Sequence, residues 1–376
     1  YEGKTVGEIQ INSLAAKAPI YDRKWTKTKL PEKKTQIKNL KKIKLEDALL
    51  KILSSPNQSN KSWVTDQFDQ MVMTDTVQRS GSDAAILRIH KKEKAIAVTV
   101  DSSANYCKAH PHTGGKQIVC ENWRNLISVG AKPIAITNCL NFGNPENSKV
   151  MGEFAECLLG IKEACEFLDY PVVSGNVSLY NGTNKKNIYP TPVIGGVGLI
   201  LDINNKINHY FKEEENIILQ IGKNFGQLYQ SVFLEEIYSI TDGPPPEINL
   251  SNEKNNGLAV LKLINDKLVL SVHDISAGGL ILALAEMSLS SGYGVSIDKP
   301  KNLSSLVEYY FSEDQGRYLV EVKAGNLNKI CKILNKDNIF NEKVGTVQKD
   351  FFEVPGEFKI DINDLYKTNN TWYNNF

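Results

Sequence analysis

The sequence has 376 residues, of which 41% are hydrophobic and 23% are charged, and its formal net charge is +1. A chain of this length exceeds what one hydrophobic core usually serves, so we expect two domains of roughly 150 to 200 residues. The small net charge argues against nucleic-acid binding through a broad basic face. No run of eighteen apolar residues and no signal peptide is present, so we expect no membrane association and a cytoplasmic location.

The first 44 residues are predicted to form a connector with one short strand. Lysines crowd residues 24–44, and a solvated linker explains them more simply than a binding site does. Residues 45–53 then predict a short amphipathic helix that ends near Pro56.

Residues 45–204 are predicted to form the first domain. Apolar runs at 85–90 and 94–101 predict two paired strands, and residues 114–129 predict a helix. Helical spacing of apolar residues at 149–169 predicts a second helix, in which two of the six cysteines lie on the apolar face. Since no CxxC spacing occurs, we expect buried free thiols rather than metal ligands or disulfides.

Two strands of this domain lead into polar segments. The strand that ends at Thr137 is followed by Asn138 and further amides, and the helix at 149–169 connects it to the next strand. That second strand begins the segment PVVSGNVSLYN at 171–181. A strand, a helix and a strand in this order bring both polar strand ends to one rim of the sheet.

The segment PVVSGNVSLYN combines features suited to phosphate and metal. Val172 and Val173 are β-branched and predict a buried strand that enters a turn at Gly175 and Asn176. Gly175 allows the backbone to approach an anion closely, while Asn176 and Ser178 supply oxygen groups. A plain corner between a strand and a loop is the alternative interpretation.

Residues 205–376 are predicted to form the second domain, in which strands and helices alternate as in a mixed α+β fold. The predicted strands span 216–222, 268–273, 294–298, 317–322 and 342–347. The predicted helices span 225–237, 253–264, 278–290 and 327–334. Aromatic residues near the C-terminus predict a docking face for the last segment; they are Tyr366, Trp372, Tyr373 and Phe376.

Two motifs of the second domain have a functional and a structural interpretation. His273 and Asp274 could form an acid–base pair, but a histidine at a strand end more often bonds a local carbonyl or carboxylate. Gly278 and Gly279 could open a phosphate-binding helix N-terminus, or they could allow that helix to pack closely on the sheet.

Four separated motifs carry a resemblance to a known family. They are GSDAAILRI at 81–89, AITNCLNFGNPE at 135–146, PVVSGNVSLYN at 171–181 with PTPVIGGVG at 190–198, and HDISAGGL at 273–280 with FSEDQGRYLVEV at 311–322. In this order they resemble the large subunit of phosphoribosylformylglycinamidine synthase, in particular the C-terminal half of its small, multi-subunit form. The sequences of the motifs GNVSLYN and FGNPE disfavour a stand-alone ATP enzyme of the same superfamily.

The resemblance implies an N-terminal domain of the aminoimidazole ribonucleotide synthetase type, followed by its α+β C-terminal partner domain. It also implies ATP-dependent conversion of formylglycinamide ribonucleotide to the amidine, with ATP and Mg²⁺ as cofactors. Implied partners are a first half, a glutamine amidotransferase subunit and a small bridging subunit. Because the family's catalytic histidines belong to that first half, we expect this chain to be an inactive fragment with no catalytic residue of its own. A homodimer through the first domain is then expected.

The family's binding residues carry over to four positions. By resemblance, Asn138 and Gly175 contact ATP, Asn176 supplies an oxygen to magnesium, and Ser178 contacts the ribonucleotide substrate. The family usually has aspartate at the position of Asn138, so a charge is lost there, although an asparagine can still hydrogen-bond a ribose hydroxyl or an adenine amine. The alternative function is a catalytically silent scaffold or nucleotide-binding module.

The triplet at Glu313, Asp314 and Gln315 resembles a substrate-binding triplet of the family's first half. Its middle residue differs from that of the first-half triplet. It also lies in the other of the family's two duplicated halves, at the pseudosymmetric position, so a structural role is favoured.

Overall fold

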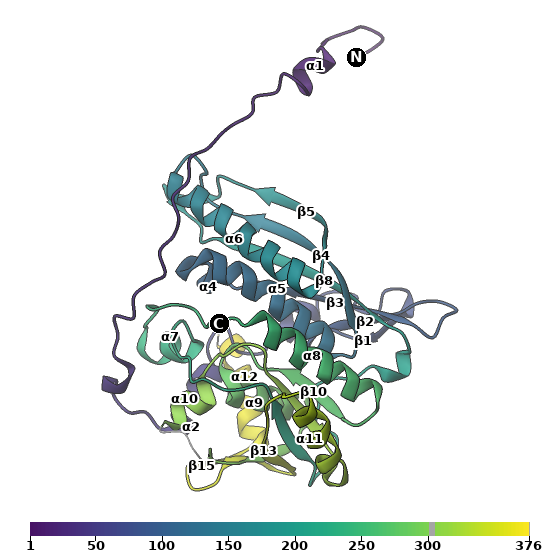
Figure 1. Cartoon of the computed structure of the whole chain (residues 1–376), viewed down its shortest axis with the longest axis vertical. Coiled ribbons are helices and arrows are strands. Elements are labelled where there is room, and N and C mark those ends of the chain that lie inside the picture. The colour runs from purple at the N-terminus through teal and green to yellow at the C-terminus, as the bar shows by residue number, and fades with distance from the viewer. Residues whose placement is uncertain (301–304, 376) are drawn as a thin grey trace.

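The computed structural model describes residues 1–300 and 305–375 and contains two β-sheets, each covered by helices (Figure 1). The first sheet has the order β1-β2-β3-β8-β4-β5, in which β4 and β5 are parallel and the other neighbours are antiparallel. Its strands are β1 (Thr76–Gln78), β2 (Ala85–Arg88), β3 (Ala95–Asp101), β8 (Thr191–Ile200), β4 (Lys132–Asn141) and β5 (Val172–Ser178). A two-stranded hairpin, β6 (Gly182–Thr183) with β7 (Lys186–Asn187), follows β5.

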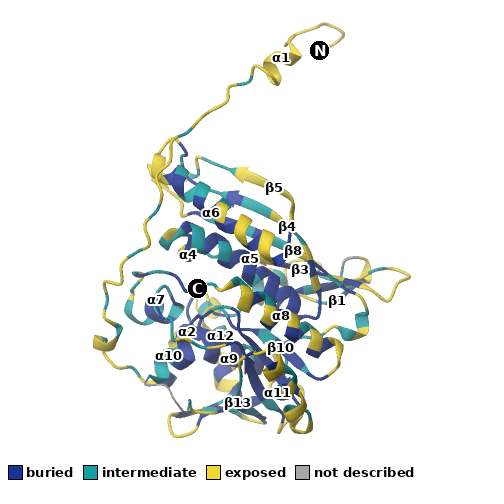
Figure 2. Cartoon of the chain, in the orientation of Figure 1, coloured by how far each residue is buried: buried dark blue, intermediate teal, exposed yellow. Residues whose placement is uncertain are grey.

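Helices α5 (Pro111–Ser128) and α6 (Ser148–Leu168) cover one face of this sheet (Figure 1). The short α4 (Ala104–Ala109) precedes them. Cys157 and Cys165 are buried on α6, and all six cysteines are free, but Cys139 and Cys331 are only partly buried, unlike the prediction of buried thiols. The opposite face of the sheet carries no helix and is exposed along β5, which is yellow in Figure 2.

The second sheet has the order β10-β12-β9-β13-β11-β14-β15. Its strands are β9 (Ile217–Ile221), β10 (Ser271–Asp274), β11 (Gly294–Ile297), β12 (Tyr318–Val322), β13 (Asn341–Gln348), β14 (Phe351–Val354) and β15 (Phe358–Asp361). The helices that accompany it are α7 (Val232–Tyr238), α8 (Leu250–Asn265), α9 (Gly279–Ser291), α10 (Leu306–Phe311), α11 (Leu327–Lys336) and α12 (Ile362–Asn374). The mixed α+β fold predicted from the sequence is confirmed.

Helix α5 lies between the two sheets and packs against α6 and β8 on one side and α8 and β10 on the other. Close approach of α8 depends on Gly257, where an added Cβ would lie 2.1 Å from the ring of Trp123 on α5. The main core therefore runs through both sheets, and a second core lies among α9, α10, β11 and β14. Helix α2 (Leu45–Leu53) belongs to this second core and contacts α7, α9 and α12.

The connector differs from its prediction. Residues 1–44 contain no strand; they form a short helix α1 (Ile11–Leu14), a 3₁₀ turn η1 (Ile37–Asn39) and an extended trace along the molecule (Figure 1). The expected strand finds no sheet neighbour, because the trace joins the body through isolated contacts such as the Thr26 amide donating to the Ser148 carbonyl. Two short helices, α3 (Ser62–Thr65) and the 3₁₀ turn η2 (Val72–Thr74), lead into the first sheet.

Two predictions about PVVSGNVSLYN are wrong. Gly175 and Asn176 form no turn, because β5 continues through them to Ser178 and pairs with β4 along its length. Val172 and Val173 are not buried; they are 44% and 71% exposed. The reason is that β5 is an edge strand with a neighbour on one side only.

The predicted helix at 225–237 is also partly wrong, since α7 begins only at Val232. The Asp314 carboxylate accepts hydrogen bonds from the backbone amides of Phe225 and Gly226, at 2.8 and 2.9 Å. These bonds hold the preceding residues in a loop, in which Gly226 and Gln230 have positive φ. A buried carboxylate thereby replaces helical hydrogen bonding.

The C-terminal docking face is only partly as predicted. In α12 the buried residues are Ile362 and Leu365, whereas Tyr366 is 54% exposed. Tyr373 stacks on Trp63, with ring centroids 4.7 Å apart. Phe376 lies outside the described residues.

Candidate functional site

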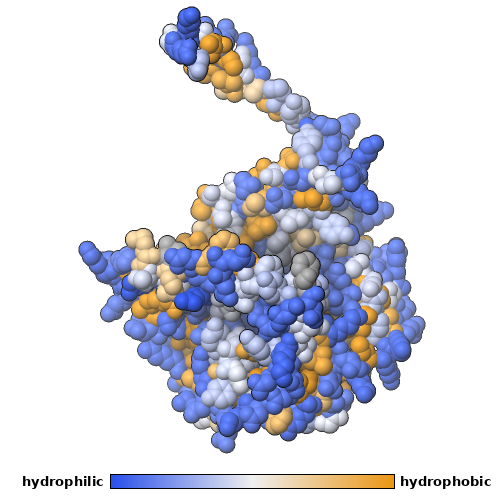
Figure 3. Space-filling model, turned by 180° about the vertical axis from the view of Figure 1, so that it is seen from behind, coloured by the Kyte–Doolittle hydropathy of each residue, from blue (hydrophilic) through white to orange (hydrophobic). Residues whose placement is uncertain are grey.

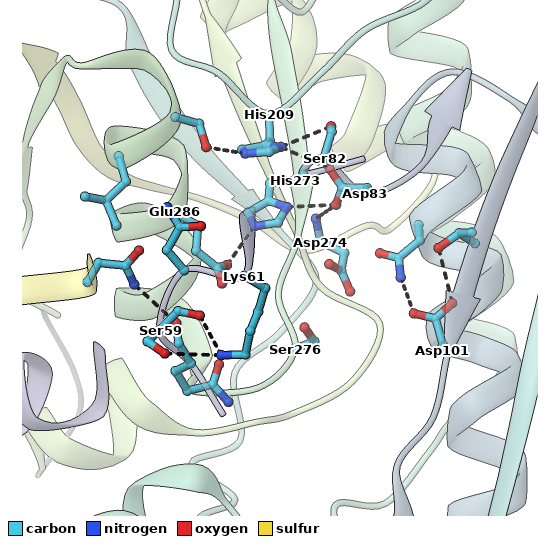
Figure 4. Close-up of a pocket in the computed structure, with 18 of the residues that line it drawn as sticks. Ser59, Lys61, Ser82, Asp83, Asp101, His209, His273, Asp274, Ser276 and Glu286 are labelled. Atoms are coloured by element: carbon cyan, nitrogen blue, oxygen red, sulfur yellow. Dashed lines mark hydrogen bonds and ion pairs between the residues drawn. The ribbon is translucent and has the colours of Figure 1, made fainter. Parts of the chain in front are cut away.

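A cavity of about 600 Å³ lies between the two sheets and is lined by polar side chains of both (Figure 4). Asp83 and Asp101 reach it from the first sheet, and His273 and Asp274 from β10 of the second. Lining residues also come from α9, α12 and the segment before α3; among them are Ser59, Lys61, Glu286, Ser290 and Tyr366. Ligand-binding sites commonly form at such domain junctions.

Carboxylates gather between this cavity and the adjoining one next to α4. Asp101 accepts hydrogen bonds from the side-chain amides of Asn122 and Asn125, both at 2.7 Å. Burial raises the pKa of Asp101 to about 7 and that of Asp274 to about 6. Burial and the two aspartates together raise the pKa of Glu121 to about 8. Oxygen donors of this kind suit hard cations such as Mg²⁺.

Stability is therefore expected to fall as the pH rises from about 4 to about 8, because the folded chain holds protons on Asp101, Glu121 and Asp274 that the unfolded chain has released. A carboxyl group whose pKa is higher in the folded chain than in the unfolded chain stabilises the fold at pH values below its pKa in the unfolded chain. This contribution is lost as the pH rises through its pKa in the folded chain. Glu121→Gln should flatten this fall, whereas Glu166→Gln on the exposed face of α6 should not. Urea midpoints at pH 5 and pH 8 measure the effect; equal slopes in the wild type and Glu121→Gln would contradict it.

Next to these carboxylates, the Arg124 side chain of α5 forms ion pairs and a hydrogen bond that connect the two parts of the chain. Its guanidinium is fully buried and donates to Glu253 at 2.8 Å, to Gln315 at 2.8 Å and to Asp274 at 3.4 Å. All three partners belong to the second part of the chain. No sequence signal predicts this network, because the partners lie 129 to 191 residues away from Arg124.

His273 has the structural surroundings that its sequence position favours. Its ring lies between the carboxylates of Asp83 and Glu286, at 2.7 and 3.0 Å (Figure 4). The glycines after it allow close packing, since a Cβ on Gly279 would lie 2.5 Å from the Ser312 carbonyl. Glu313 accepts from the Gly278 and Val232 amides, which supports the structural role expected for that triplet.

The four residues carried over from the family lie away from this cavity, on β4 and β5 at the edge of the first sheet. The strands pair Asn138 with Gly175, Cys139 with Asn176 and Asn141 with Ser178. Since side chains alternate along a strand, Asn138 and Gly175 share the helix-covered face, while Asn176 and Ser178 lie on the open face. The structure brings the four together at one edge and divides them in pairs between the two faces.

Gly175 is required by its neighbour. A Cβ at this position would lie 2.0 Å from Asn138 Oδ1 and 2.6 Å from the Asn138 carbonyl oxygen. Asn138 also lines a hollow of about 530 Å³ between β4 and α6, together with Lys162, Glu166 and Asp169. A side chain at position 175 would therefore displace the Asn138 side chain from the rim of this hollow.

The open face around Asn176 and Ser178 is apolar over several strands. Large side chains on this face are between 37% and 65% exposed; they are Ile96, Val98, Val100, Ile134 and Val197. Seen from behind, orange patches interrupt the hydrophilic surface of this part of the molecule (Figure 3). Several exposed apolar side chains on one face of a sheet are typical of an interaction face.

The fold and sequence match one family. Residues 81–200 match the model for the AIR synthase related protein, N-terminal domain, and residues 225–354 match that for the AIR synthase related protein, C-terminal domain. The chain therefore belongs to the AIR synthase related proteins.

Within this family the chain is similar to phosphoribosylformylglycinamidine synthase subunit PurL, and its two domains fit the C-terminal half of that subunit. It is 50% identical to the subunit of Pelagibacter ubique over 377 residues, which is 100% of this chain and 52% of the relative. The PurL of Rhodopseudomonas palustris strain BisB5 is 42% identical over 98% of this chain and 50% of its own length. The chain spans about half the length of the curated relatives it matches.

Solved structures of PurL are also similar to this chain, again over about half of their own length. The structure of PurLQS from Thermotoga maritima has a TM-score of 0.63 and 25% identity, covering 93% of this chain and 48% of that chain. T. maritima PurL complexed with FGAR has a TM-score of 0.69 at 16% identity, covering 85% of this chain and 53% of that one, and supports the fold alone. No helix in the described part of this chain is long and apolar enough to cross a membrane.

Proposed function

We propose that this chain is one half of the ATP-dependent ligase that converts formylglycinamide ribonucleotide to formylglycinamidine ribonucleotide in purine biosynthesis. ATP phosphorylates the amide oxygen, and ammonia released from glutamine by an amidotransferase subunit displaces the phosphate. The chain acts with a first half that carries the catalytic histidines, with the amidotransferase and a small bridging subunit, in the cytoplasm. Its units are a connector at 1–44 and domains at 45–204 and 205–376, with α2 packing onto the second.

The observation that carries this proposal is the open face of the first sheet. Asn176 is exposed and Ser178 is partly exposed on an apolar face that no described part of the chain covers. A surface of this kind is buried by a partner, and a partner seated there would place its own groups next to both side chains. The surface of the partner thus completes the substrate site, and this chain forms one wall of it.

The residues fit the cofactors in different ways. Asn176 offers a neutral oxygen of the type Mg²⁺ accepts, but one such ligand cannot hold the ion, so its carboxylate ligands come from the first half. Magnesium, when bound, neutralises phosphate charge. Asn138 and Gly175 place an amide and a bare backbone at the strand edge, where ATP can approach closely. Ser178 orients the ribonucleotide through its hydroxyl.

In an enzyme reconstituted from both halves, Asn176→Ala should weaken magnesium-dependent ATP use and leave the fold intact. Losing one metal ligand or aligned contact should raise the barrier by about 2–4 kcal/mol. Rates are measured over a magnesium titration, with Asn252→Ala, an exposed asparagine in the first turn of α8, as the matched control. Unchanged rates for Asn176→Ala would count decisively against its role.

Without the first half, the chain is expected to form a homodimer through the open face of the first sheet. Pairing across a two-fold axis would cover the exposed valines, with an interface of about 2,000 Å² or more. Sedimentation at micromolar concentration checks this, and Val173→Asp, a charge on the edge strand, should shift the chain toward monomer. A monomer at every concentration, or a dimer that Val173→Asp leaves unaffected, would refute this mode of assembly.

A further inference from the structure

Three potential metal ligands from separate parts of the chain meet at the wall of the cavity between the sheets. Asp83 lies just before β2, His209 lies in the segment that links the two sheets, and His273 lies on β10. One ligand atom of each lies within 4.8 Å of the others (Figure 4). None of the three is among the residues assigned to the ATP or substrate site above.

Both histidines turn the same ring atom toward Asp83. His273 Nδ1 lies 2.7 Å from Asp83 Oδ1, and His209 Nδ1 lies 3.6 Å from Asp83 Oδ2. His209 Nδ1 also lies 3.1 Å from Ser82 Oγ, which it would leave on binding an ion. The other nitrogen of each ring has a separate partner, Glu286 at 3.0 Å for His273 Nε2 and Ser290 at 2.8 Å for His209 Nε2. Metal-ligating histidines are oriented in this way, with the outer nitrogen donating to a carboxylate or another oxygen.

Asp83 supplies an independent indication. Its side chain is fully buried, and its Oδ2 atom has no hydrogen-bond partner among the described residues. A buried carboxylate oxygen without a partner is costly, and His209 Nδ1, at 3.6 Å, is too distant for a hydrogen bond. The oxygen therefore keeps free lone pairs beside the ring of His209.

We propose that Asp83, His209 and His273 bind a divalent transition-metal ion, with Zn²⁺ as the best match. Two imidazole nitrogens and one carboxylate oxygen form a common zinc donor set, with bonds of about 2.0–2.2 Å. Two ligands on a tetrahedral ion are then about 3.4 Å apart, so the 2.7 and 3.6 Å distances to Asp83 are close to what an ion needs. The two rings stack with centroids 4.8 Å apart and planes at 28°, so the rings must turn for both Nδ1 lone pairs to meet at the ion. Water from the cavity can fill the fourth position, and the cavity gives the ion a path of entry.

This site differs chemically from the magnesium site proposed at the edge of the sheet. Magnesium prefers an octahedral set of oxygens, whereas imidazole favours zinc, copper or nickel. The ligands also come from both sides of the domain junction, so a bound ion would fasten the first sheet to β10.

Without metal, a proton occupies part of this position. Although burial opposes it, the Asp83 and Glu286 carboxylates raise the pKa of His273 well above its usual value. An imidazolium shared between them satisfies Asp83 Oδ1, but it leaves Oδ2 unpaired. Metal binding releases the proton on Nδ1, so affinity should fall as the pH is lowered.

The test uses the whole chain after removal of any affinity tag and of metal by a chelator. Isothermal titration with Zn²⁺ should show one site, and Co²⁺ in its place should give the strong visible absorption of a tetrahedral ion. His209→Gln, which keeps a hydrogen-bonding side chain, should weaken Zn²⁺ binding at least about 100-fold, and Glu286→Gln about 10- to 100-fold. His90→Ala, an exposed histidine paired with Asp75, is the matched control and should not change binding.

Thermal melts with and without Zn²⁺ give a second readout. The melting temperature should rise with Zn²⁺ in the wild type and in His90→Ala, and it should not rise in His209→Gln. Absence of Zn²⁺ binding at neutral pH in the folded wild type would overturn the site. An octahedral Co²⁺ spectrum, or equal affinity in the wild type and Glu286→Gln, would overturn it as well, and Glu286→Gln serves if His209→Gln does not fold.

Discussion

Purified alone, the chain is expected to form no amidine from formylglycinamide ribonucleotide, ATP and ammonia. Asn176 is exposed and Ser178 partly exposed on one wall of the site, and neither can act as an acid, a base or a sufficient metal site. Adding a matching first half should restore turnover from undetectable to measurable. Ammonia-dependent product formation is followed by chromatography.

The control for this experiment is the same mixture with Asn176→Ala in place of the wild-type chain, which should bind the first half and turn over slowly. Turnover by the purified chain alone would contradict the proposed division of the site. A mixture that binds tightly but stays inactive would instead favour the alternative of a silent scaffold.

The largest effect on stability is expected at Arg124. Arg124→Met removes the cation that pairs Glu253 and Asp274, whose side chains are 1% and 5% exposed. Since breaking a buried ion pair leaves an uncompensated charge, the free energy of unfolding should fall by about 3–5 kcal/mol. Urea denaturation at neutral pH, monitored by circular dichroism, measures the change.

Lys162→Met is the matched control, because Lys162 pairs with Glu166 on the exposed face of α6 at 3.7 Å. Such a surface pair contributes only about 0.3–0.5 kcal/mol. A loss at Arg124 no larger than this would show that the buried network contributes little to holding the sheets together. The defect should also shrink at low pH, where Glu253 and Asp274 take up protons.

Local patterns in the sequence predict most elements of the fold. Helical spacing locates α6 and α11, and β-branched runs locate β3 and β12, because each of these elements buries one face or both in a way that its own residues encode. The failures have long-range causes. Asp314 holds the residues before α7 in a loop from 88 positions away, and β5 stays extended through Gly175 because β4 pairs with it.

The residues of the candidate sites likewise fall into those that a local motif singles out and those that only long-range contacts bring together. Motif resemblance singles out Asn138, Gly175, Asn176 and Ser178, but only the strand register shows that they lie in pairs on opposite faces. Asp83 stands within a quoted motif without any sign of its role. His209 follows no motif, and its partner Asp83 is more than 100 residues away in the chain. Contacts of this range have no local signature in one sequence.

Hydrogen exchange of the backbone amides of β5, with and without the first half, tests most directly whether the open face of the first sheet meets a partner there. The account predicts that amides at 172–178 exchange quickly in the chain alone, at a concentration too low for it to dimerise, and become protected when the first half is added at a concentration that restores turnover. The fully buried β12 should be protected in both states and serves as the internal reference. Equal exchange of 172–178 in the active mixture and in the chain alone would contradict the account, because the partner would then be seated elsewhere.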